Sequence, residues 1–358
     1  MTAIYDALPR AFRAIVPRPE DRIPVTPLTG IHAGLASLPL VLLAYLARRP
    51  QTYVLRLLVL PIAVLPLIHV SFGNVWTIPS LNVYNWGQSY RTGLLVEVLV
   101  AKALEIALTK QGMLKHDEKT LHPDTRASES LRSALALLCT TRGLSFKFSG
   151  GTHGPPPKRP QERFGMVFDL ITFIAVLVFN TPASAWPPVM DNPWVANSLH
   201  ELWSLRWHQL LRRTFYVFGG IPGFYLAGPF GMLFGTFLAS GLFHETSIYA
   251  MGKGLDPHPV LFFAIQAPLM VGERMWRQVT GRRVGGALGR AWVYFVIFVV
   301  AQPMVDSWHR RGLGGGMVIP PFLSPARLVV LPLLQHTSSR TIDSLGNIIG
   351  SGNNSRTM

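Results

Sequence analysis

Long runs of apolar residues alternate with short basic segments along this chain. Residues 28–47 are twenty positions without a charged side chain, and they are followed by Arg48 and Arg49. A run of this length is typical of a transmembrane helix closed by basic residues at the membrane surface. Residues 53–72 predict a second span, and we expect Arg56, near one edge of it, to extend toward the lipid headgroups.

Charged residues interrupt the next helical stretch. Residues 92–108 have a helical period but contain Glu97, Lys102 and Glu105. Lys102 and Glu105 are three positions apart and could pair on a helix that faces the interior of a bundle. The stretch therefore predicts either an internal span or a helix at the membrane surface. Residues 74–90, rich in Trp, Tyr and Asn, predict an interfacial segment.

Two basic regions bear on the topology. Residues 110–163 hold ten Lys and Arg against five acids, and residues 273–290 form a basic loop with five Arg. The excess of positive charge places the first region in the cytosol. If the second is also cytosolic, residues 215–250 must cross the membrane twice, turning near Gly228 and Pro229, or not at all.

Further apolar runs extend the membrane domain, namely residues 165–180, 258–271, 291–305 and 318–334. The chain thus predicts an all-α, polytopic integral membrane helix bundle of roughly seven to nine transmembrane or reentrant helices. We expect a polar N-terminal segment at residues 1–27 and one membrane domain at residues 28–335, which includes the polar loop 110–163. Residues 336–358 predict a disordered tail.

The composition agrees with a membrane protein. Of the 358 residues, 49% are hydrophobic and 14% are charged, and the net charge is +15. The basic residues lie between the apolar runs, where they act as topology signals and contact membrane lipid, and no nucleic-acid-binding motif accompanies them. Nucleic acid is therefore not an expected partner. The single cysteine, Cys139, excludes an internal disulfide and a Cys-based metal cluster.

One segment in the second half combines helix signals with histidines. Ser198 and Glu201 have the spacing of a capping box, which predicts a helix from Leu199 to Arg213. One face of this helix would be apolar, with the tryptophans, and the opposite face would turn its histidines toward the bundle cavity. The apolar face holds Leu199, Trp203, Trp207 and Leu210, and the opposite face holds His200, Ser204 and His208.

His244 follows an uncharged run, residues 230–243, and precedes Glu245. Burying either polar group without a partner costs roughly 2 to 7 kcal/mol or more, so the two residues need a polar cavity. Glycines spaced four residues apart let membrane helices approach closely, which predicts tight packing near His244. The chain has two such pairs here, Gly219 with Gly223 and Gly231 with Gly235.

His244 and His208 suggest acyl transfer to an alcohol. A hydroxyl attacks a thioester slowly unless a base removes its proton, and an imidazole with a pKa of about 6.5 suits that role. His244 would be the base, and His208 would orient a substrate or stabilise oxyanion charge. Alternatively, each histidine packs in a polar seam between helices. Zinc is disfavoured because His200 and His208 would lie ~12 Å apart along one helix, so we predict no metal site.

Three arginines near His208 are candidate donor-binding residues. Arg206, Arg212 and Arg213 could bind the phosphates of coenzyme A through charge-assisted contacts. An equally simple role is to anchor the helix end to anionic headgroups. The chain has no Walker loop, no Gly-x-Ser-x-Gly elbow and no dinucleotide fingerprint, so no bound cofactor is expected and acyl-CoA would act as a co-substrate.

Three motifs, in this order, resemble the wax synthase-like branch of the membrane-bound O-acyltransferase superfamily. They are TTRGLSFKF at 140–148, LWSLRWH at 202–208 and SGLFHE at 240–245. The resemblance implies that His244 is the catalytic histidine and that His208 occupies the second catalytic position. It also implies an acyl-CoA donor and a hydroxyl acceptor. The chain departs from the branch pattern at Ser204, Leu205 and residues 144–146, and these departures bear on the acceptor and the CoA contacts.

Within that branch, compact fungal relatives acetylate terpenoid or meroterpenoid hydroxyls, whereas plant relatives make wax esters. By this resemblance we expect an acetyl group to pass from acetyl-CoA to a lipophilic alcohol such as a terpenoid. The protein would be a multi-pass protein of the endoplasmic reticulum or another endomembrane. The alternative enzyme is a long-chain wax ester or sterol ester synthase. The alternative of another class is a proton-coupled transporter with His244 and Glu245 in a relay, which the lack of an inverted repeat disfavours.

Overall fold

The computed structural model describes residues 2–78, 82–115, 118–121, 127–140, 146–147, 190–315 and 326–332, and helices dominate these ranges. The one sheet among them has two short parallel strands, β1 (Ile23–Pro24) and β2 (Asn74–Val75). The predicted helical class is thus confirmed. The predicted span at 165–180 and the predicted tail at 336–358 lie outside the described residues.

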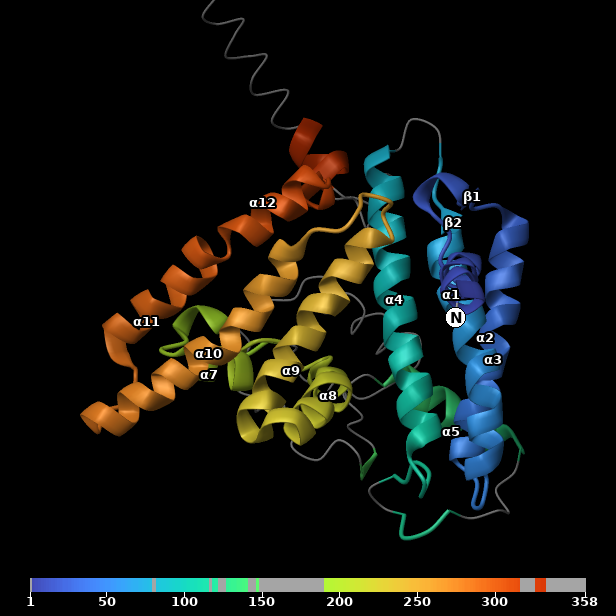
Figure 1. Cartoon of the computed structure of the whole chain (residues 1–358), viewed down its shortest axis with the longest axis horizontal. Helices are drawn as coiled ribbons and strands as arrows, with labels where there is room; N and C mark the ends of the chain where they lie inside the picture. The colour runs from blue at the N-terminus through green and yellow to red at the C-terminus, as the bar shows by residue number, and fades with distance from the viewer. Residues whose placement is uncertain are drawn as a thin grey trace, which may run out of the picture.

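The N-terminal helices form one group, drawn in blue to green in Figure 1. They are α1 (Thr2–Ile15), α2 (Pro27–Ala47), α3 (Tyr53–Gly73), α4 (Asn82–Leu108) and α5 (Ala127–Cys139). Helices α2, α3 and α4 pack against one another, and α5 packs against α2. The predicted spans at 28–47 and 53–72 are confirmed as helices α2 and α3, both of which are long and apolar enough to cross a membrane.

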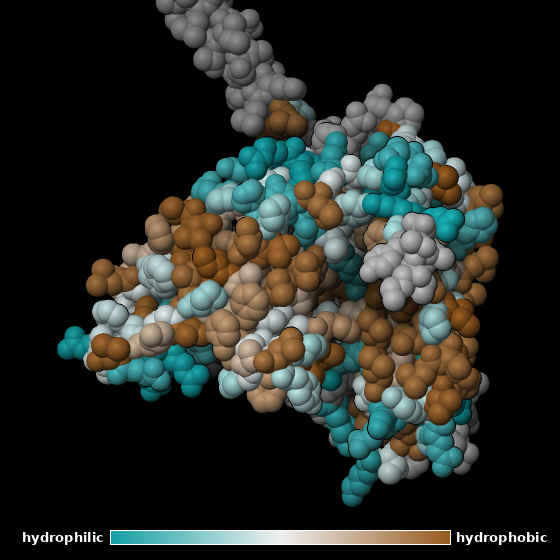
Figure 2. Space-filling view, viewed as in Figure 1, coloured by the Kyte–Doolittle hydropathy of each residue, from teal (hydrophilic) through white to brown (hydrophobic). Residues whose placement is uncertain are grey.

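Apolar side chains fill the space between α2, α3 and α4. Leu43, Ala63 and Ile106 are fully buried there. Other apolar side chains of α2 and α3 point outward, where lipid would cover them. Figure 2 shows a broad band of hydrophobic residues across the molecule, with hydrophilic residues above and below it. This band is the surface expected of an integral membrane protein.

Arg56 is buried and does not extend to the membrane surface, so that prediction is wrong. Its side chain is 1% exposed. The guanidinium donates hydrogen bonds to the carbonyl oxygens of Ile106, Thr109 (2.8 Å) and Lys110 (3.1 Å). Carbonyls at the end of a helix lack partners within it and carry partial negative charge. Arg56 of α3 therefore caps the C-terminal end of α4.

Helix α4 joins the two halves of the molecule and begins earlier than predicted. It starts at Asn82, so residues 82–90 are helical and not part of an irregular interfacial segment. Its polar side chains face inward: Glu97 accepts a hydrogen bond of 2.9 Å from Ser247 of α9. Glu105 forms an ion pair with Arg213. The inward placement agrees with the internal-helix alternative.

The C-terminal half begins with short helical segments that lead into a long helix. They are α7 (Leu199–Glu201), the π-helical η5 (Leu202–Arg206), α8 (Arg212–Phe215), the π-helical η6 (Tyr216–Gly220) and α9 (Ile221–Tyr249). By length and composition, Arg212–Tyr249 is a further candidate span.

A hairpin bends this candidate span back on itself. Ala227 and Gly228 leave the helical conformation, and Gly228 has a φ of 59°. A Cβ on Gly219 would lie 1.9 Å from the carbonyl oxygen of Gly235, and one on Gly231 would lie 2.0 Å from that of Gly223. The two predicted glycine pairs therefore pack against each other, and the predicted turn near Gly228 is confirmed.

Helix α10 (Pro257–Thr280) runs back beside α9 and is followed by α11 (Gly286–Phe295), the π-helical η7 (Val296–Val300) and α12 (Gln302–Arg310). Residues 273–280, predicted as the start of a basic loop, are helical, and the connection is only 281–285. The predicted span at 258–271 is the first part of α10.

The last three segments, from Gly286 to Arg310, form another candidate span, so the described residues hold four such stretches. The total of seven to nine stays a prediction. The remaining short segments are the 3-10 turns η1 (Pro19–Asp21), η4 (Pro193–Val195) and η8 (Leu313–Gly315), and the π-helical η10 (Ala326–Val330), the last within the predicted run 318–334.

Candidate active site

A cavity of 1370 Å³ lies between α7, η5, the α8–α9 hairpin and α10. His208 and His244 both line it, although 36 residues separate them in the chain. The structure thus brings together the two histidines that the sequence predicted as catalytic.

His244 is held between aromatic rings of three helices. Its ring stacks on Phe263 of α10, with a centroid distance of 4.7 Å and an interplanar angle of 12°. Trp308 of α12 and Phe243 pack around it, each with a centroid distance of 5.9 Å. Among the described residues the buried Nδ1 atom has no hydrogen-bond partner. The imidazole is therefore oriented by packing and not by a hydrogen bond to Nδ1 from another described residue.

The predicted helix from Leu199 to Arg213 is wrong beyond Arg206. Trp207 has extended backbone angles, φ −73° and ψ 154°, so the chain leaves the helix there. His208 consequently lies in a loop and does not share a helical face with His200 and Ser204. The start of the helix is as predicted, because the Ser198 hydroxyl accepts a hydrogen bond of 3.0 Å from the amide of Glu201.

Hydrogen bonds within the same segment hold the loop that carries His208 in place. Gln209 is buried and donates hydrogen bonds to the carbonyl oxygens of Trp203 (3.2 Å) and Trp207 (2.9 Å). The ring of Trp207 lies 5.6 Å from that of His208. Because Trp207 and Gln209 flank His208, these contacts position its imidazole at the cavity wall.

Trp203 ties this segment to α10. Its indole Nε1 donates a hydrogen bond of 3.1 Å to Gln266, and its ring lies 6.3 Å from that of Phe263. Phe263 thus contacts Trp203 and His244, so one aromatic side chain links the two histidine-bearing segments. Sequence reasoning missed Phe263, since an apolar residue in an apolar run carries no signal of its contacts.

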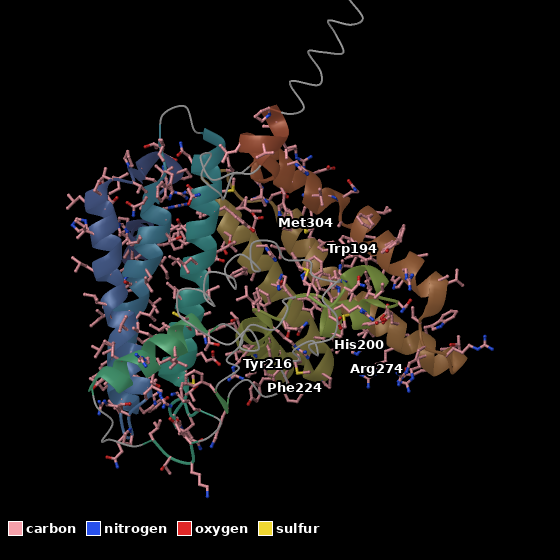
Figure 3. The ribbon with its side chains drawn as sticks, turned by 180° about the vertical axis from the view of Figure 1, so that it is seen from behind. Trp194, His200, Tyr216, Phe224, Arg274 and Met304 are labelled. Atoms are coloured by element: carbon pink, nitrogen blue, oxygen red, sulfur yellow. The ribbon has the colours of Figure 1, made fainter. Side chains whose placement is uncertain are left out.

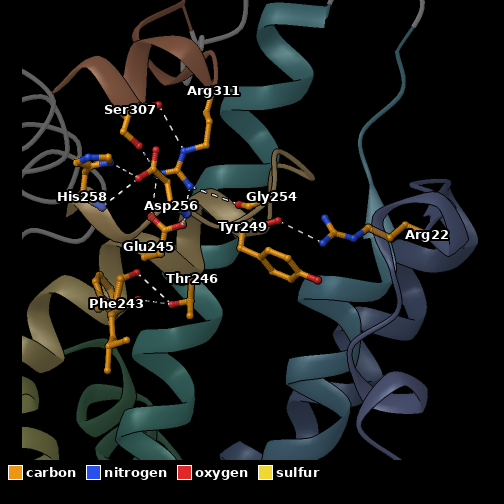
Figure 4. Close-up of polar contacts among 11 residues, drawn as sticks. Arg22, Phe243, Glu245, Thr246, Tyr249, Gly254, Asp256, His258, Ser307 and Arg311 are labelled. Carbon is orange, nitrogen blue, oxygen red and sulfur yellow. Dashed lines mark hydrogen bonds and ion pairs between the residues drawn. The ribbon is translucent and has the colours of Figure 1, made fainter. Parts of the chain in front are cut away.

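Glu245 does not face the cavity beside His244. Its carboxylate pairs with Arg311 through two contacts, of 2.6 and 2.8 Å, and accepts a hydrogen bond of 2.7 Å from the amide of Asp256 (Figure 4). Both charged side chains are more than nine-tenths buried. Glu245 therefore stabilises the packing of α9 against the end of α12. This placement removes the carboxylate from the proton relay that the transporter alternative requires.

Asp256 fixes the connection between α9 and α10. It caps α10 by accepting a hydrogen bond of 3.0 Å from the amide of His258. Burial raises the pKa of Asp256, but the hydrogen bonds from the backbone and side chain of His258 lower it more, so that the pKa falls to about 2. The carboxylate is therefore charged at neutral pH and holds the start of α10 in place.

The three predicted donor-binding arginines differ in their contacts. Arg206 forms an ion pair of 2.6 Å with Glu201, and Arg213 forms one with Glu105. Among the described residues, Arg212 donates hydrogen bonds to two neutral acceptors, the carbonyl oxygen of Ser204 and the side chain of Gln209. Arg212 and Arg213 line the cavity, whereas Arg206 is not among its lining residues. In the described part of the chain, no three His, Cys, Asp or Glu side chains lie close enough to hold a metal ion.

Comparison with known proteins matches this region of the chain to a family. The profile of the "Membrane bound O-acyl transferase family" matches residues 186–265, which include both histidines. The motif at 140–148, which the sequence also suggested, lies mostly outside the described residues. No solved structure matches the chain.

Three relatives match parts of the chain. "Acetyltransferase aurG" of Calcarisporium arbuscula is 28% identical over 37% of this chain and 35% of its own length. "O-Mevalon transferase yanI" of Aspergillus niger is 34% identical over 20% of this chain and 19% of its own length. "Probable long-chain-alcohol O-fatty-acyltransferase 1" of Arabidopsis thaliana is 24% identical over 42% of this chain and 49% of its own length.

The matched regions therefore span about a fifth to a half of each relative. The family profile covers the segment that builds most of the cavity, and all three relatives are named as transferases. Over residues 186–265 the chain is thus similar to the membrane bound O-acyl transferase family.

Proposed function

We propose that this protein transfers an acyl group, most simply acetyl, from acyl-CoA to a hydroxyl of a lipophilic acceptor such as a terpenoid. The observation that carries the proposal is the meeting of His208 and His244 in one cavity inside the segment that matches the family. The apolar surface of the helices supports a location in a membrane, which we propose is the endoplasmic reticulum or another endomembrane.

In this mechanism His244 is the general base. It accepts the proton of the acceptor hydroxyl as the oxygen attacks the thioester carbonyl, which gives a tetrahedral intermediate with a negatively charged oxygen. The intermediate collapses with cleavage of the carbon–sulfur bond. The CoA thiolate leaves and takes the proton back from the His244 imidazolium. The products are an ester and free CoA, and the histidine returns to its neutral form.

The cavity offers both a polar and an apolar surface to the two substrates. Its polar part includes Ser240 and Thr236 along the same helix as His244, and its apolar part includes Phe230, Leu233 and Phe237. An acceptor with a large hydrocarbon frame and one hydroxyl fits such a lining, because the frame packs against the apolar side chains while the hydroxyl reaches the imidazole.

A product assay tests the proposal and separates it from its alternative. The purified protein is incubated with radiolabelled acetyl-CoA or palmitoyl-CoA and a panel of alcohols that includes terpenoids, sterols and fatty alcohols. Labelled acetate esters of polycyclic alcohols support the proposal. Labelled palmitate esters of fatty alcohols or sterols would instead establish the wax or sterol ester synthase. The names of the relatives include both short-chain and long-chain transferases.

Replacing Cys139 with alanine should leave most of the activity. The thiol is the only one in the chain and lies on α5, outside the residues that line the cavity. The proposed direct transfer needs no acyl-enzyme, so incubation with donor alone should label no side chain. The measurements are turnover of Cys139→Ala and mass spectrometry of the protein after exposure to acyl-CoA. A trapped acyl group would contradict direct transfer.

His208→Ala and His208→Asn should differ. We propose that His208 positions substrate or stabilises the oxyanion, for which an asparagine amide can substitute. The alanine variant should raise the activation barrier by about 2 to 4 kcal/mol, while the asparagine variant should lose much less. The measurement is kcat of both variants with one acceptor. Equal losses would mean that the imidazole titrates during the reaction, and no loss in either would assign His208 to packing.

A further inference from the structure

Three arginines at the end of α10 line the same cavity as His244. Arg274 and Arg277 are three residues apart on the helix and share one face, and Arg283 follows the turn at Gly281 that ends α10. Figure 3 shows Arg274 at the same end of the molecule as His200, which also lines the cavity. The sequence analysis placed these three side chains in a basic loop and did not include them among the candidate donor-binding residues.

The positive charge of this group has no acidic counterpart in the described residues. Arg274, Arg277 and Arg283 are exposed, and none forms an ion pair or a side-chain hydrogen bond with another described residue. The neighbouring carboxylate, Glu273, is engaged elsewhere. It accepts hydrogen bonds from the amides of Leu199 (2.7 Å) and His200 (3.1 Å) and from the indole of Trp292 (3.0 Å).

The other acid on the cavity wall pairs with a cation of its own. Among the described lining residues the only carboxylates are Glu201 and Glu273, and Glu201 pairs with Arg206. Arg213, across the cavity, pairs with Glu105. The α10 group therefore keeps its donors and its charge for an anion that enters from outside. Guanidinium groups are suited to phosphate, because their planar donors match two phosphate oxygens at once.

We infer that Arg274, Arg277 and Arg283 bind the phosphate groups of the acyl donor, which rests on the proposed function. Along α10, Arg274 and Arg277 lie 11 and 14 residues beyond Phe263, the ring stacked on His244. At 1.5 Å per residue this is roughly 16 to 21 Å. Coenzyme A carries its thioester at the end of a long, flexible arm and its phosphates at the other end. With the phosphates on the arginines, the arm extends along α10 and delivers the thioester to His244.

Binding of free CoA to the purified protein tests this without relying on turnover. In the triple variant Arg274→Gln/Arg277→Gln/Arg283→Gln, the Kd for CoA should rise at least about 10-fold. The matched control is Arg282→Gln, which alters a neighbouring arginine of the same turn that does not line the described cavity and should bind CoA like the wild type. Thermal melting of each variant in detergent verifies that it is folded.

A shortened donor gives a second readout. Acyl-pantetheine keeps the thioester and the arm but lacks the nucleotide phosphates, so the triple variant should use it as well as the wild type does. With acyl-CoA, the variant should show a raised KM and a nearly unchanged kcat. A loss of turnover with both donors would place the arginines in the chemistry or the fold instead and would overturn the inference.

The remaining outcomes separate the two proposals. If the wild type transfers acyl groups and the triple variant binds CoA equally well, the inference fails and the proposed function stands. If the wild type neither binds CoA nor transfers an acyl group, the proposed function fails and the inference fails with it. If the variant loses bound anionic lipid in native mass spectrometry but keeps its CoA affinity, the arginines serve lipid headgroups and the inference is overturned.

Discussion

His244→Ala should lower kcat by roughly 100- to 10,000-fold, the usual effect of losing a general base. The imidazole lines the cavity, and its orientation comes from Phe243, Phe263 and Trp308 and not from a hydrogen bond to its Nδ1 atom in the described structure. Alanine removes the base but keeps the helix, since it is the strongest helix former. The variant should therefore accumulate in membranes at a normal level.

The control for this variant is His32→Ala, which removes an exposed histidine of α2. It should keep full turnover in the same assay. Imidazole added to the buffer should restore part of the activity of His244→Ala, because the cavity has room for a free ring. Near-normal turnover of purified His244→Ala would end the assignment of His244 as the base.

Glu245→Gln should destabilise the protein strongly. The change leaves the positive charge of Arg311 buried without its carboxylate, and breaking a buried ion pair in this way costs about 3 to 5 kcal/mol. The glutamine can also accept only one of the two hydrogen bonds from the guanidinium, whose other partners in the described part of the chain are Ser307 and the carbonyl oxygen of Gly254. We expect a clearly lower Tm in detergent and a reduced yield from membranes.

The matched variant is the double change Glu245→Gln/Arg311→Met, in which neither charge remains. It should recover most of the lost Tm, since replacing both partners of a buried pair is often close to neutral. Turnover per folded molecule should stay close to the wild-type value in both variants, because only the amount of folded protein changes. A Glu245→Gln protein with normal Tm but no activity would instead mean that the carboxylate carries protons, as the transporter alternative supposes.

Local patterns predicted those parts of the fold that depend on short stretches of sequence. Uninterrupted apolar runs located α2 and α3, because the length of such a run alone indicates a membrane helix. The spacing of the glycines located the hairpin, because small residues four positions apart allow helices to approach closely. The break at Trp207 was missed, since the sequence has no Gly or Pro there. The cause lies partly in tertiary contacts, such as the hydrogen bond from Trp203 to Gln266.

The contacts between side chains of the site were harder to predict than the identity of its two histidines. His244 was identified because a lone imidazole beside an uncharged run is unusual. Its stacking on Phe263 and the pairing of Glu245 with Arg311 join residues that are 19 and 66 positions apart. Neither contact leaves a periodic signal in the chain. Arg56 was placed at the membrane surface by its position in the run, whereas its true partners are carbonyl groups of another helix.

The two arms of the hairpin at Gly228 also lie too close together for another molecule to pass between them. Its arms touch through their backbones at Gly219 and Gly235 and again at Gly223 and Gly231, with no space for a methyl group between them. A lipid tail needs more room than a methyl group, so it cannot enter the cavity between the arms. Side chains on one side of the hairpin line the cavity, while Tyr225 and Leu226 at its tip are more than four-fifths exposed. Under the proposed function, the hairpin would separate a thioester bound in the cavity from lipid on its outer side.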